Sequence, residues 1–190
     1  MAKIALDIDS TLHPYWDLLA EIAQQRYGVA LPYDTQDDWG IPGLDREQIV
    51  DCVRETHSEA NVLGAVPYSG AVETVCEWHR AGHWIHITSH RSTDALGATG
   101  KWLEAIGLPF DDLHCSYDKI SRCVELEIDI LIDDSPINIA GALERGITAA
   151  TIVHPWNVEL VRSGKAIGAA DWPELREALE PHLTQSRDGR

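Results

Sequence analysis

The residues best suited to chemistry stand near the start of the chain, where two aspartates and two hydroxyl residues follow a short apolar run. Residues 3–6 have the length and composition of a buried strand, and Asp7, Asp9, Ser10 and Thr11 come directly after it. In a continuing strand the two aspartates would share a face, where their charges repel unless a cation or a proton lies between them. Turn and helix-capping chemistry is the alternative explanation of these residues.

A second apolar run, residues 128–132, ends in Asp133 and Asp134. If both runs are strands of one parallel sheet, their carboxylates meet at the same edge, and such a cluster needs a counter-ion. Oxygen ligands without Cys or paired His favour a hard cation, and Mg²⁺ is typically held by one or two carboxylates together with phosphate and water. Helix capping before Pro136 would also explain the two acids.

Three further residues suit a phosphate group. We expect Lys119 at the N-terminus of a helix, where the macrodipole disfavours a cation by up to roughly 1 kcal/mol, so its position indicates an anion in front of it. A surface ion pair with Asp118 or Glu125 is the alternative. Thr88 and Ser89 follow another expected strand and offer hydroxyls and backbone donors, although turn chemistry alone would also explain them.

The elements that must position these residues alternate along the chain from residue 67. Helices are expected over 69–81, 93–106, 119–127, 136–145 and 172 to about 183, and strands over 84–88, 113–116, 128–132 and 148–153. The alternation predicts an α/β fold whose parallel sheet is covered on both faces and binds ligands at the carboxyl ends of its strands. We therefore expect these polar side chains at one edge of the sheet: Asp7, Asp9, Thr88, Ser89, Lys119, Asp133, Asp134 and His154.

Residues 13–66 follow a different pattern and look like a small helical insertion after the first strand. Helical periodicity is seen before Gly28 and again over 45–60, with a loop rich in Pro and Gly between. At the other end of the chain, residues 154–157 (His-Pro-Trp-Asn) follow the last expected strand, and a structural loop is favoured over a ligand there. The residues from 184 onward are polar and predict a frayed tail.

Composition limits the partners. With 31 acidic residues against 15 basic ones, the chain carries a formal net charge of −16. Such a surface repels nucleic-acid backbones and anionic membranes, so we expect neither a nucleic-acid polymer nor a membrane as a partner. The N-terminus does not resemble a signal peptide, no apolar run reaches bilayer-spanning length, and the four cysteines lack metal-type spacing. These features predict a cytoplasmic protein and leave its oligomeric state open.

Four motifs in order resemble those of the haloacid dehalogenase-like (HAD) hydrolase superfamily. They are residues 7–11 (Asp-Ile-Asp-Ser-Thr), Thr88-Ser89, Lys119 and Asp133-Asp134, and the resemblance covers residues 3 to about 154. Within the superfamily the chain is similar to the 5'(3')-deoxyribonucleotidase group, through its helical insertion and its Ser-Tyr-Asp-Lys and Leu-Ile-Asp-Asp-Ser-Pro stretches. The resemblance implies a Rossmann-like three-layer core of residues 1–12 and 67–183, with residues 13–66 as a small helical cap and 184–190 as a polar tail.

The resemblance also implies roles for these residues. Asp7 would be the nucleophile that forms an aspartyl-phosphate, and Asp9 would act as general acid and then general base. Mg²⁺ would be bound by the side chains of Asp7 and Asp134 and the backbone carbonyl of Asp9, with Asp133 acting through water. The phosphoryl oxygens would be held by Thr88, Ser89 and Lys119.

Substrate contacts are expected at Thr11, Trp16, Trp39 and Arg91. The aromatic residues of the insertion could stack on a nucleobase, and filling the insertion's own core is the alternative. The His-Arg pair at 90–91 is more basic than the resemblance to the nucleotidase group leads us to expect, so contacts with phosphate or substrate would differ there.

Together these features predict a Mg²⁺-dependent phosphomonoesterase that acts on a small phosphorylated metabolite. The substrate they favour is a nucleoside or deoxynucleoside monophosphate. Two alternatives stay open. One is a phosphatase of a sugar phosphate or another small phosphoester, and the other is a nucleotide-binding regulator without catalysis.

Overall fold

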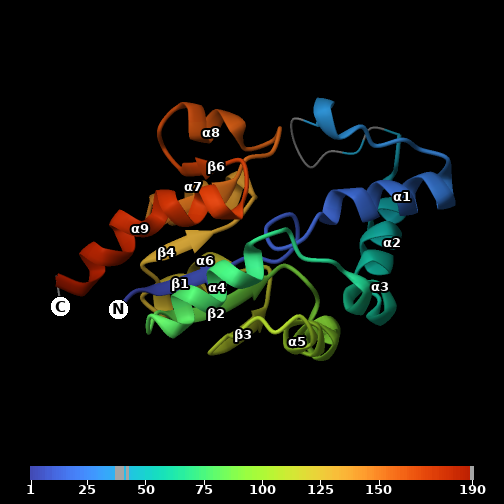
Figure 1. Ribbon diagram of the computed structural model, residues 1–190. Helices are drawn as coiled ribbons and strands as arrows, with labels where there is room; N and C mark the ends of the chain where they lie inside the picture. The colour runs from blue at the N-terminus through green and yellow to red at the C-terminus, as the bar shows by residue number, and fades with distance from the viewer. Residues whose placement is uncertain (37–40, 42, 189–190) are drawn as a thin grey trace.

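The computed structural model describes residues 1–36, 41 and 43–188, with side chains to residue 184 (Figure 1). Its centre is a sheet of six strands in the order β3-β2-β1-β4-β5-β6, and every neighbouring pair is parallel. The strands are β1 (Lys3–Leu6), β2 (Trp84–Ser89), β3 (Asp112–Cys115), β4 (Ile130–Ile132), β5 (Thr148–Ile152) and β6 (Ile167–Ala169). This arrangement confirms the predicted α/β fold class.

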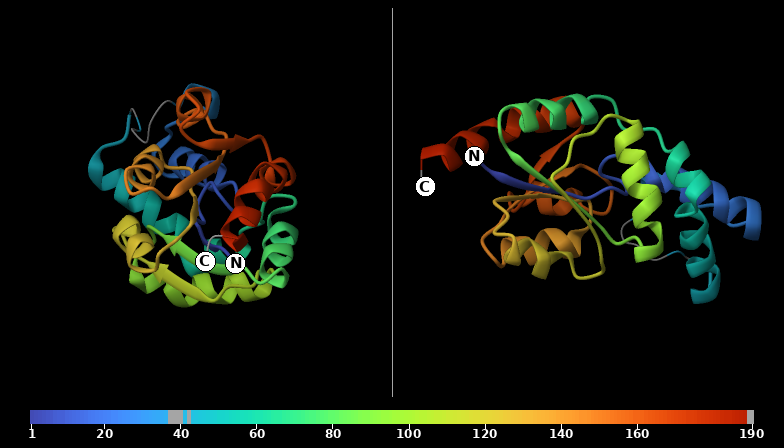
Figure 2. Two further views of the ribbon diagram at one scale, coloured as in Figure 1. Left: turned by 90° about the vertical axis from the view of Figure 1, so that its left-hand side faces the viewer. Right: turned by 90° about the horizontal axis from the view of Figure 1, so that it is seen from below.

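Helices cover both faces of the sheet. They are α1 (Tyr15–Tyr27), η1 (Tyr33–Thr35), α2 (Arg46–Thr56), α3 (Glu59–Gly64), α4 (Ala71–Arg80), η2 (Thr93–Ala95), α5 (Leu96–Ala105), α6 (Lys119–Glu125), α7 (Pro136–Leu143), α8 (Val158–Arg162) and α9 (Trp172–Asp188). One face packs against α4, α5 and α9, and the other against α6 and α7 (Figure 2). Along β1, Ile4 and Leu6 enter the first core and Ala5 the second, which explains why this strand is apolar throughout.

Some boundaries differ from expectation. The helix expected over 45–60 is two helices, because Ser58 takes an extended backbone conformation between α2 and α3. The strand β6 and the helix α8 were not expected, since both are short and β6 contains a glycine. The prediction that the last helix ends near residue 183 is wrong. Residues 184–188 contain no Gly or Pro, so α9 continues to Asp188.

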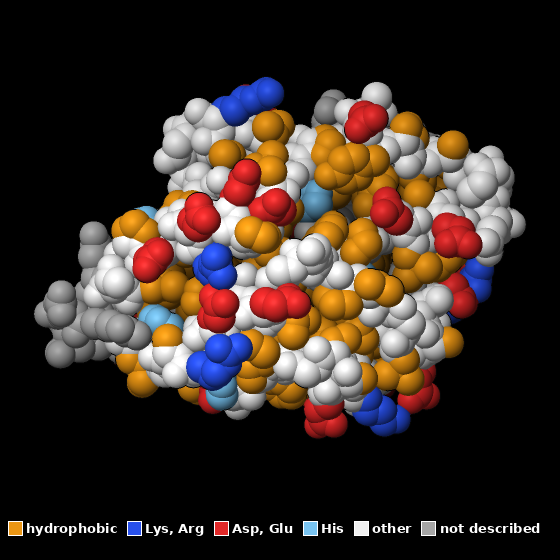
Figure 3. Space-filling view, in the orientation of Figure 1, with side chains coloured by type: hydrophobic (Ala, Val, Ile, Leu, Met, Phe, Trp, Pro, Cys, Tyr) orange, Lys and Arg blue, Asp and Glu red, His pale blue; other side chains and the backbone are white. Residues whose placement is uncertain are grey.

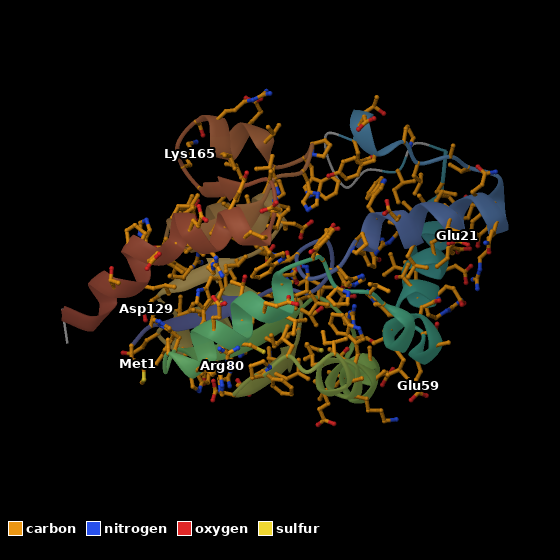
Figure 4. All side chains as sticks on the ribbon, viewed as in Figure 1. Met1, Glu21, Glu59, Arg80, Asp129 and Lys165 are labelled. Atoms are coloured by element: carbon orange, nitrogen blue, oxygen red, sulfur yellow. The ribbon has the colours of Figure 1, made fainter. Side chains whose placement is uncertain are left out.

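The helices α1, α2 and α3 lie together at one end of the molecule, beyond the carboxyl ends of the strands (Figure 1). In Figure 4, Glu21 and Glu59 mark this helical end, and Met1, Arg80 and Asp129 mark the opposite one. The chain leaves the sheet region at Leu12 and returns at Tyr68, whose backbone N–H donates a hydrogen bond to the Leu12 carbonyl (2.8 Å). The two segments that connect the helical insertion to the core are therefore adjacent.

Acidic side chains are scattered over the face shown in Figure 3 and are not gathered into one patch. The excess of negative charge is thus spread over this surface. No helix in the described part of the chain combines the length and the apolar character needed to cross a membrane.

Candidate active site

A cavity of about 380 Å³ opens at the carboxyl edge of the sheet, below the helical insertion. Three of its acids, Asp7, Asp133 and Asp134, form what we call the acidic cluster: each offers a carboxylate oxygen within 4.8 Å of the others. All three are buried. They meet because β1 and β4 are neighbours, with the Asp7 N–H donating to the Ile132 carbonyl (2.9 Å) where the two strands end.

Lys119 is the cation of this cluster. Its Nζ donates to Asp7 and to Asp133 (3.0 Å for the latter), and its side chain is buried. It begins α6, where Asp118 caps the helix by accepting the Ser121 N–H (3.1 Å). Burial alone would lower the pKa of Lys119, but the two carboxylates outweigh it and raise the pKa, so the ammonium stays charged. The surface ion pair considered from the sequence does not form.

The acidic cluster holds more negative charge than one lysine neutralises. Burial raises the pKa of Asp7 to about 7, with Lys119 opposing the rise and Asp133 and Asp9 adding to it. Burial and the charges of Asp7 and Asp133 also raise the pKa of Asp134 well above its usual range. A bound cation would reverse these shifts, and oxygen-only donors are those that a hard divalent ion such as Mg²⁺ prefers. The residues present therefore fit the expected metal.

The carboxylate of Asp133 already accepts several hydrogen bonds. Donors besides Lys119 are the Ser135 N–H (2.9 Å) and the Asn138 amide (3.0 and 3.1 Å). Asp133 is thereby oriented toward Lys119 and has little remaining capacity for a direct metal bond. Asn138 also lines the cavity and was not expected from the sequence. Its place five residues after Asp133, across the N-terminus of α7, is the signal that could have identified it.

Asp9 also lines the cavity, where cationic and imidazole groups hold its carboxylate. Arg91 donates to both of its oxygens (Nε 3.2 Å, Nη2 2.6 Å), and Nε2 of His13 and His57 lie 3.0 and 3.4 Å from them. Burial would raise the pKa of Asp9, but Arg91 and the two histidines outweigh it and hold the pKa well below its usual range. Asp9 is therefore a charged carboxylate. Neither histidine was expected in this role.

Thr88 and Ser89 end β2 and are fully buried. The Ser89 hydroxyl accepts the Arg91 N–H (3.2 Å), whereas the Thr88 hydroxyl has no hydrogen-bond partner among the described residues. Leaving a buried hydroxyl unpaired costs about 1–3 kcal/mol, so such groups are normally paired. An oxygen of a bound ligand could supply the missing partner, but neither Thr88 nor Ser89 is among the residues that line the cavity.

The residues expected to contact substrate have other surroundings. Trp16 is buried in the core of the insertion and does not line the cavity. Arg91 is also buried, donating to Thr99 (3.2 Å) besides Asp9. Thr11 is buried with its hydroxyl 3.5 Å from the Asp7 carboxylate. Trp39 lies outside the described residues.

Aromatic and apolar side chains also line the cavity. Tyr15 and His57 lie against each other on its insertion side (centroids 5.7 Å apart), and His90 stacks on Tyr117 on its core side (5.8 Å). Tyr117 is 80% exposed and the neighbouring Ile137 81% exposed. Single exposed apolar side chains are common on protein surfaces, so this exposure alone identifies no ligand. The sequence did not single out Tyr117 or Ile137.

Comparison with solved structures identifies relatives of this fold. A HAD family hydrolase from Deinococcus radiodurans R1, solved with bound phosphate and sodium, is similar (TM-score 0.69, 20% identity, covering 96% of this chain and 97% of that one). So is a predicted phosphoglycolate phosphatase from Haemophilus somnus 129PT (TM-score 0.65, 14% identity, coverage 97% and 98%). CbbY from Rhodobacter sphaeroides in complex with xylulose-(1,5)-bisphosphate is a third (TM-score 0.62, 16% identity, coverage 92% and 96%).

No protein-family model matches the chain, and no curated protein matches it. At these levels of identity the similarity concerns the fold alone. The chain thus has the fold of HAD hydrolases over nearly its whole length.

Proposed function

We propose that this protein is a Mg²⁺-dependent phosphomonoesterase that works through the chemistry of the HAD hydrolases whose fold it has. The observation that carries the proposal is the placement of Asp7 in the buried acidic cluster, between Lys119 and Asp134 and open to the cavity. A buried carboxylate next to a fixed ammonium and a hard-cation site is suited to attack phosphorus, because both positive groups stabilise charge on the phosphoryl oxygens.

In the proposed reaction a carboxylate oxygen of Asp7 attacks phosphorus in line with the leaving oxygen. The new O–P bond gives an aspartyl-phosphate, and the bond from phosphorus to the leaving oxygen breaks. Water then attacks the aspartyl-phosphate and releases inorganic phosphate and free Asp7. Lys119 and the Thr88 hydroxyl bind phosphoryl oxygens, together with donors of Ser89. Bound Mg²⁺ would neutralise negative charge shared by the carboxylates and the phosphoryl group.

Asp9 moves the protons in this scheme. Protonated Asp9 gives its proton to the leaving oxygen and takes one from the attacking water, and loss of that proton to solvent then restores the charged resting form. Because Arg91, His13 and His57 hold Asp9 in its charged form, the first proton must arrive with the substrate phosphate or from solvent. Those partners also keep its carboxylate in one orientation.

For the substrate we propose a nucleoside or deoxynucleoside monophosphate. The lining of the cavity includes Tyr15, Tyr117 and two histidines, whose rings suit a planar base. Among the described residues that line the cavity, Lys119 is the one lysine or arginine, which fits a single phosphate group better than a bisphosphate. A sugar phosphate is the second candidate, favoured by the solved complex of CbbY with xylulose-(1,5)-bisphosphate.

A phosphate-release assay tests the proposal. The purified protein is given nucleoside and deoxynucleoside monophosphates, sugar phosphates, phosphoglycolate and an aryl phosphate, each with Mg²⁺ or with EDTA. We expect release that needs Mg²⁺, is highest for the nucleotides and is lost in Asp7→Asn. Preference for a sugar phosphate would replace the nucleotide assignment. Absence of release from every ester, despite Mg²⁺ binding, would favour a nucleotide-binding regulator.

A further inference from the structure

The loop after β5, residues 154–157, is fixed against the backbone of the acidic cluster. The Asn157 amide donates to the Asp134 carbonyl (3.1 Å) and the Ile152 carbonyl (3.0 Å), and its oxygen accepts the His154 N–H (2.8 Å). All of these bonds are buried, and Asn157 has no exposed surface. The loop therefore has a defined position next to Asp134, although it contributes no carboxylate of its own.

From this loop Trp156 reaches the Asp134 side chain. Its indole Nε1 donates to Oδ2 of Asp134 at 3.0 Å, in a buried hydrogen bond. The indole N–H can only donate, and a charged carboxylate accepts more strongly than a protonated carboxyl group. The bond therefore favours the charged form of Asp134, which is the form that binds a cation. It also occupies one acceptor site of Oδ2 and restricts the rotation of the carboxylate.

The Trp156 ring is itself held from two sides. On the core side it stacks on His154 (centroids 4.6 Å apart, planes at 6°). On the insertion side it packs against Trp16 (5.5 Å) and edge-to-face against Tyr33 (5.7 Å). Aromatic pairs of this kind contribute about 0.5–1.5 kcal/mol each beyond the burial of their surfaces. The direction of the indole N–H is thus set by both parts of the molecule.

His154 connects the same loop to the first motif. Its Nε2 lies 2.7 Å from the Ser10 carbonyl, and its Nδ1 lies 2.6 Å from the Tyr33 hydroxyl. Because a carbonyl only accepts, Nε2 carries a proton, and in the neutral ring the Tyr33 hydroxyl donates to Nδ1. The loop therefore contacts the segments that carry Asp9 and Asp134.

We propose that Trp156 is a positioning residue for Asp134: its indole N–H fixes the carboxylate so that Mg²⁺ meets a preformed ligand. This inference rests on the proposed function, in which Asp134 is a metal ligand. Groups that hydrogen-bond to metal ligands in this way typically change metal affinity by about 10–100-fold when they are removed. A loop with only a structural role would instead change the stability of the fold and leave metal affinity unaltered.

The test measures Mg²⁺ affinity by calorimetric titration, without substrate, for the wild type, Trp156→Phe and Trp16→Phe. Phenylalanine keeps an aromatic ring in the stack and removes the N–H. Trp16 is the matched control because its N–H donates to the Leu31 carbonyl (3.3 Å) and not to the acidic cluster. Thermal unfolding with EDTA reports the stability of each variant in the absence of metal.

We expect Trp156→Phe to bind Mg²⁺ about tenfold or more weakly, and Trp16→Phe to bind it like the wild type. The metal-free melting temperatures of the two variants should fall by similar amounts. If Trp156→Phe bound Mg²⁺ with wild-type affinity, the inference would be overturned and the proposed function would stand. The same would follow if Mg²⁺ affinity fell equally in both variants. No Mg²⁺ binding by the wild type would contradict the proposed metal dependence itself, and with it the inference.

Discussion

Replacing the proposed nucleophile by its amide should make the metal-free protein more stable while it abolishes turnover. Asp7 is buried with two other carboxylates and one ammonium. The substitution Asp7→Asn keeps the shape of the side chain and removes one negative charge. In most proteins the loss of a buried ion pair is destabilising. Here the repulsion within the acidic cluster and the burial of charge exceed the attraction to Lys119, as the raised pKa of Asp7 indicates.

The magnitude follows from that pKa, which is raised from 3.8 to about 7 in the folded chain. At a pH between these two values, Asp7 keeps its proton in the folded chain but has lost it in the unfolded chain. The free energy of unfolding therefore falls as the pH rises through this range. One pKa unit corresponds to about 1.4 kcal/mol, so the loss reaches about 4 kcal/mol above neutral pH. In Asp7→Asn this contribution is absent, and Mg²⁺ should remove most of it from the wild type.

Denaturation by urea and by heat, with EDTA at about pH 5 and about pH 8, measures the difference. At the higher pH we expect Asp7→Asn to melt roughly 10 °C above the wild type, since about 1 kcal/mol shifts the midpoint by about 2–4 °C at this chain length. The difference in melting temperature between Asp7→Asn and the wild type should be smaller at about pH 5 and in millimolar Mg²⁺. Asp34→Asn removes an exposed carboxylate and is the control, and its melting temperature should equal that of the wild type. A variant no more stable than the wild type at the higher pH would refute the reasoning.

Three further substitutions test separate parts of the structure. Thr88→Val should keep or raise the free energy of unfolding, because it removes a buried hydroxyl that has no described partner. It should raise KM for the phosphate ester by about tenfold or more, and unchanged kinetics would exclude Thr88 from phosphate binding. Arg91→Met leaves a buried carboxylate without its cation and should cost about 3–5 kcal/mol in urea unfolding, and a loss below about 1 kcal/mol would contradict this. Gly70→Ala places a Cβ 2.9 Å from Pro173 at a residue whose φ is +82°, whereas the Cβ of Gly28→Ala, at a φ of +69°, has no atom within 4 Å. Both variants carry the strain of a positive φ, so Gly70→Ala should lower the melting temperature more than Gly28→Ala does. Equal decreases in melting temperature would show that the contact with Pro173 is relieved.

The sequence was sufficient for the parallel sheet and for the edge at which the acids gather. Asp7 and Asp133 each follow an apolar run, and in a parallel sheet the ends of neighbouring strands lie side by side, so their proximity follows from topology. Lys119 was identified because a cation at a helix N-terminus needs an anion near it. In each case the informative signal lies within a few residues of the functional group.

The remaining site residues depend on contacts between distant segments. The pair of Arg91 and Asp9 joins residues 82 positions apart, and the bond from Trp156 to Asp134 spans 22 positions. No local periodicity encodes such pairs. Trp16 illustrates the same limit, because an aromatic residue at helical spacing suits a base-stacking surface as well as a small core, and the packing of the insertion places it in the core.

The hydrogen bond between Tyr68 and Leu12 has a consequence for how this protein can diversify. Because the backbone departs and returns at neighbouring positions, a tight turn would be long enough to bridge them if the whole segment that carries α1, η1, α2 and α3 were removed. Whole lids could then be exchanged by recombination without disturbing the strand order beneath. Because His13 and His57 of the insertion contact Asp9, an exchanged insertion would have to supply groups that restore these contacts.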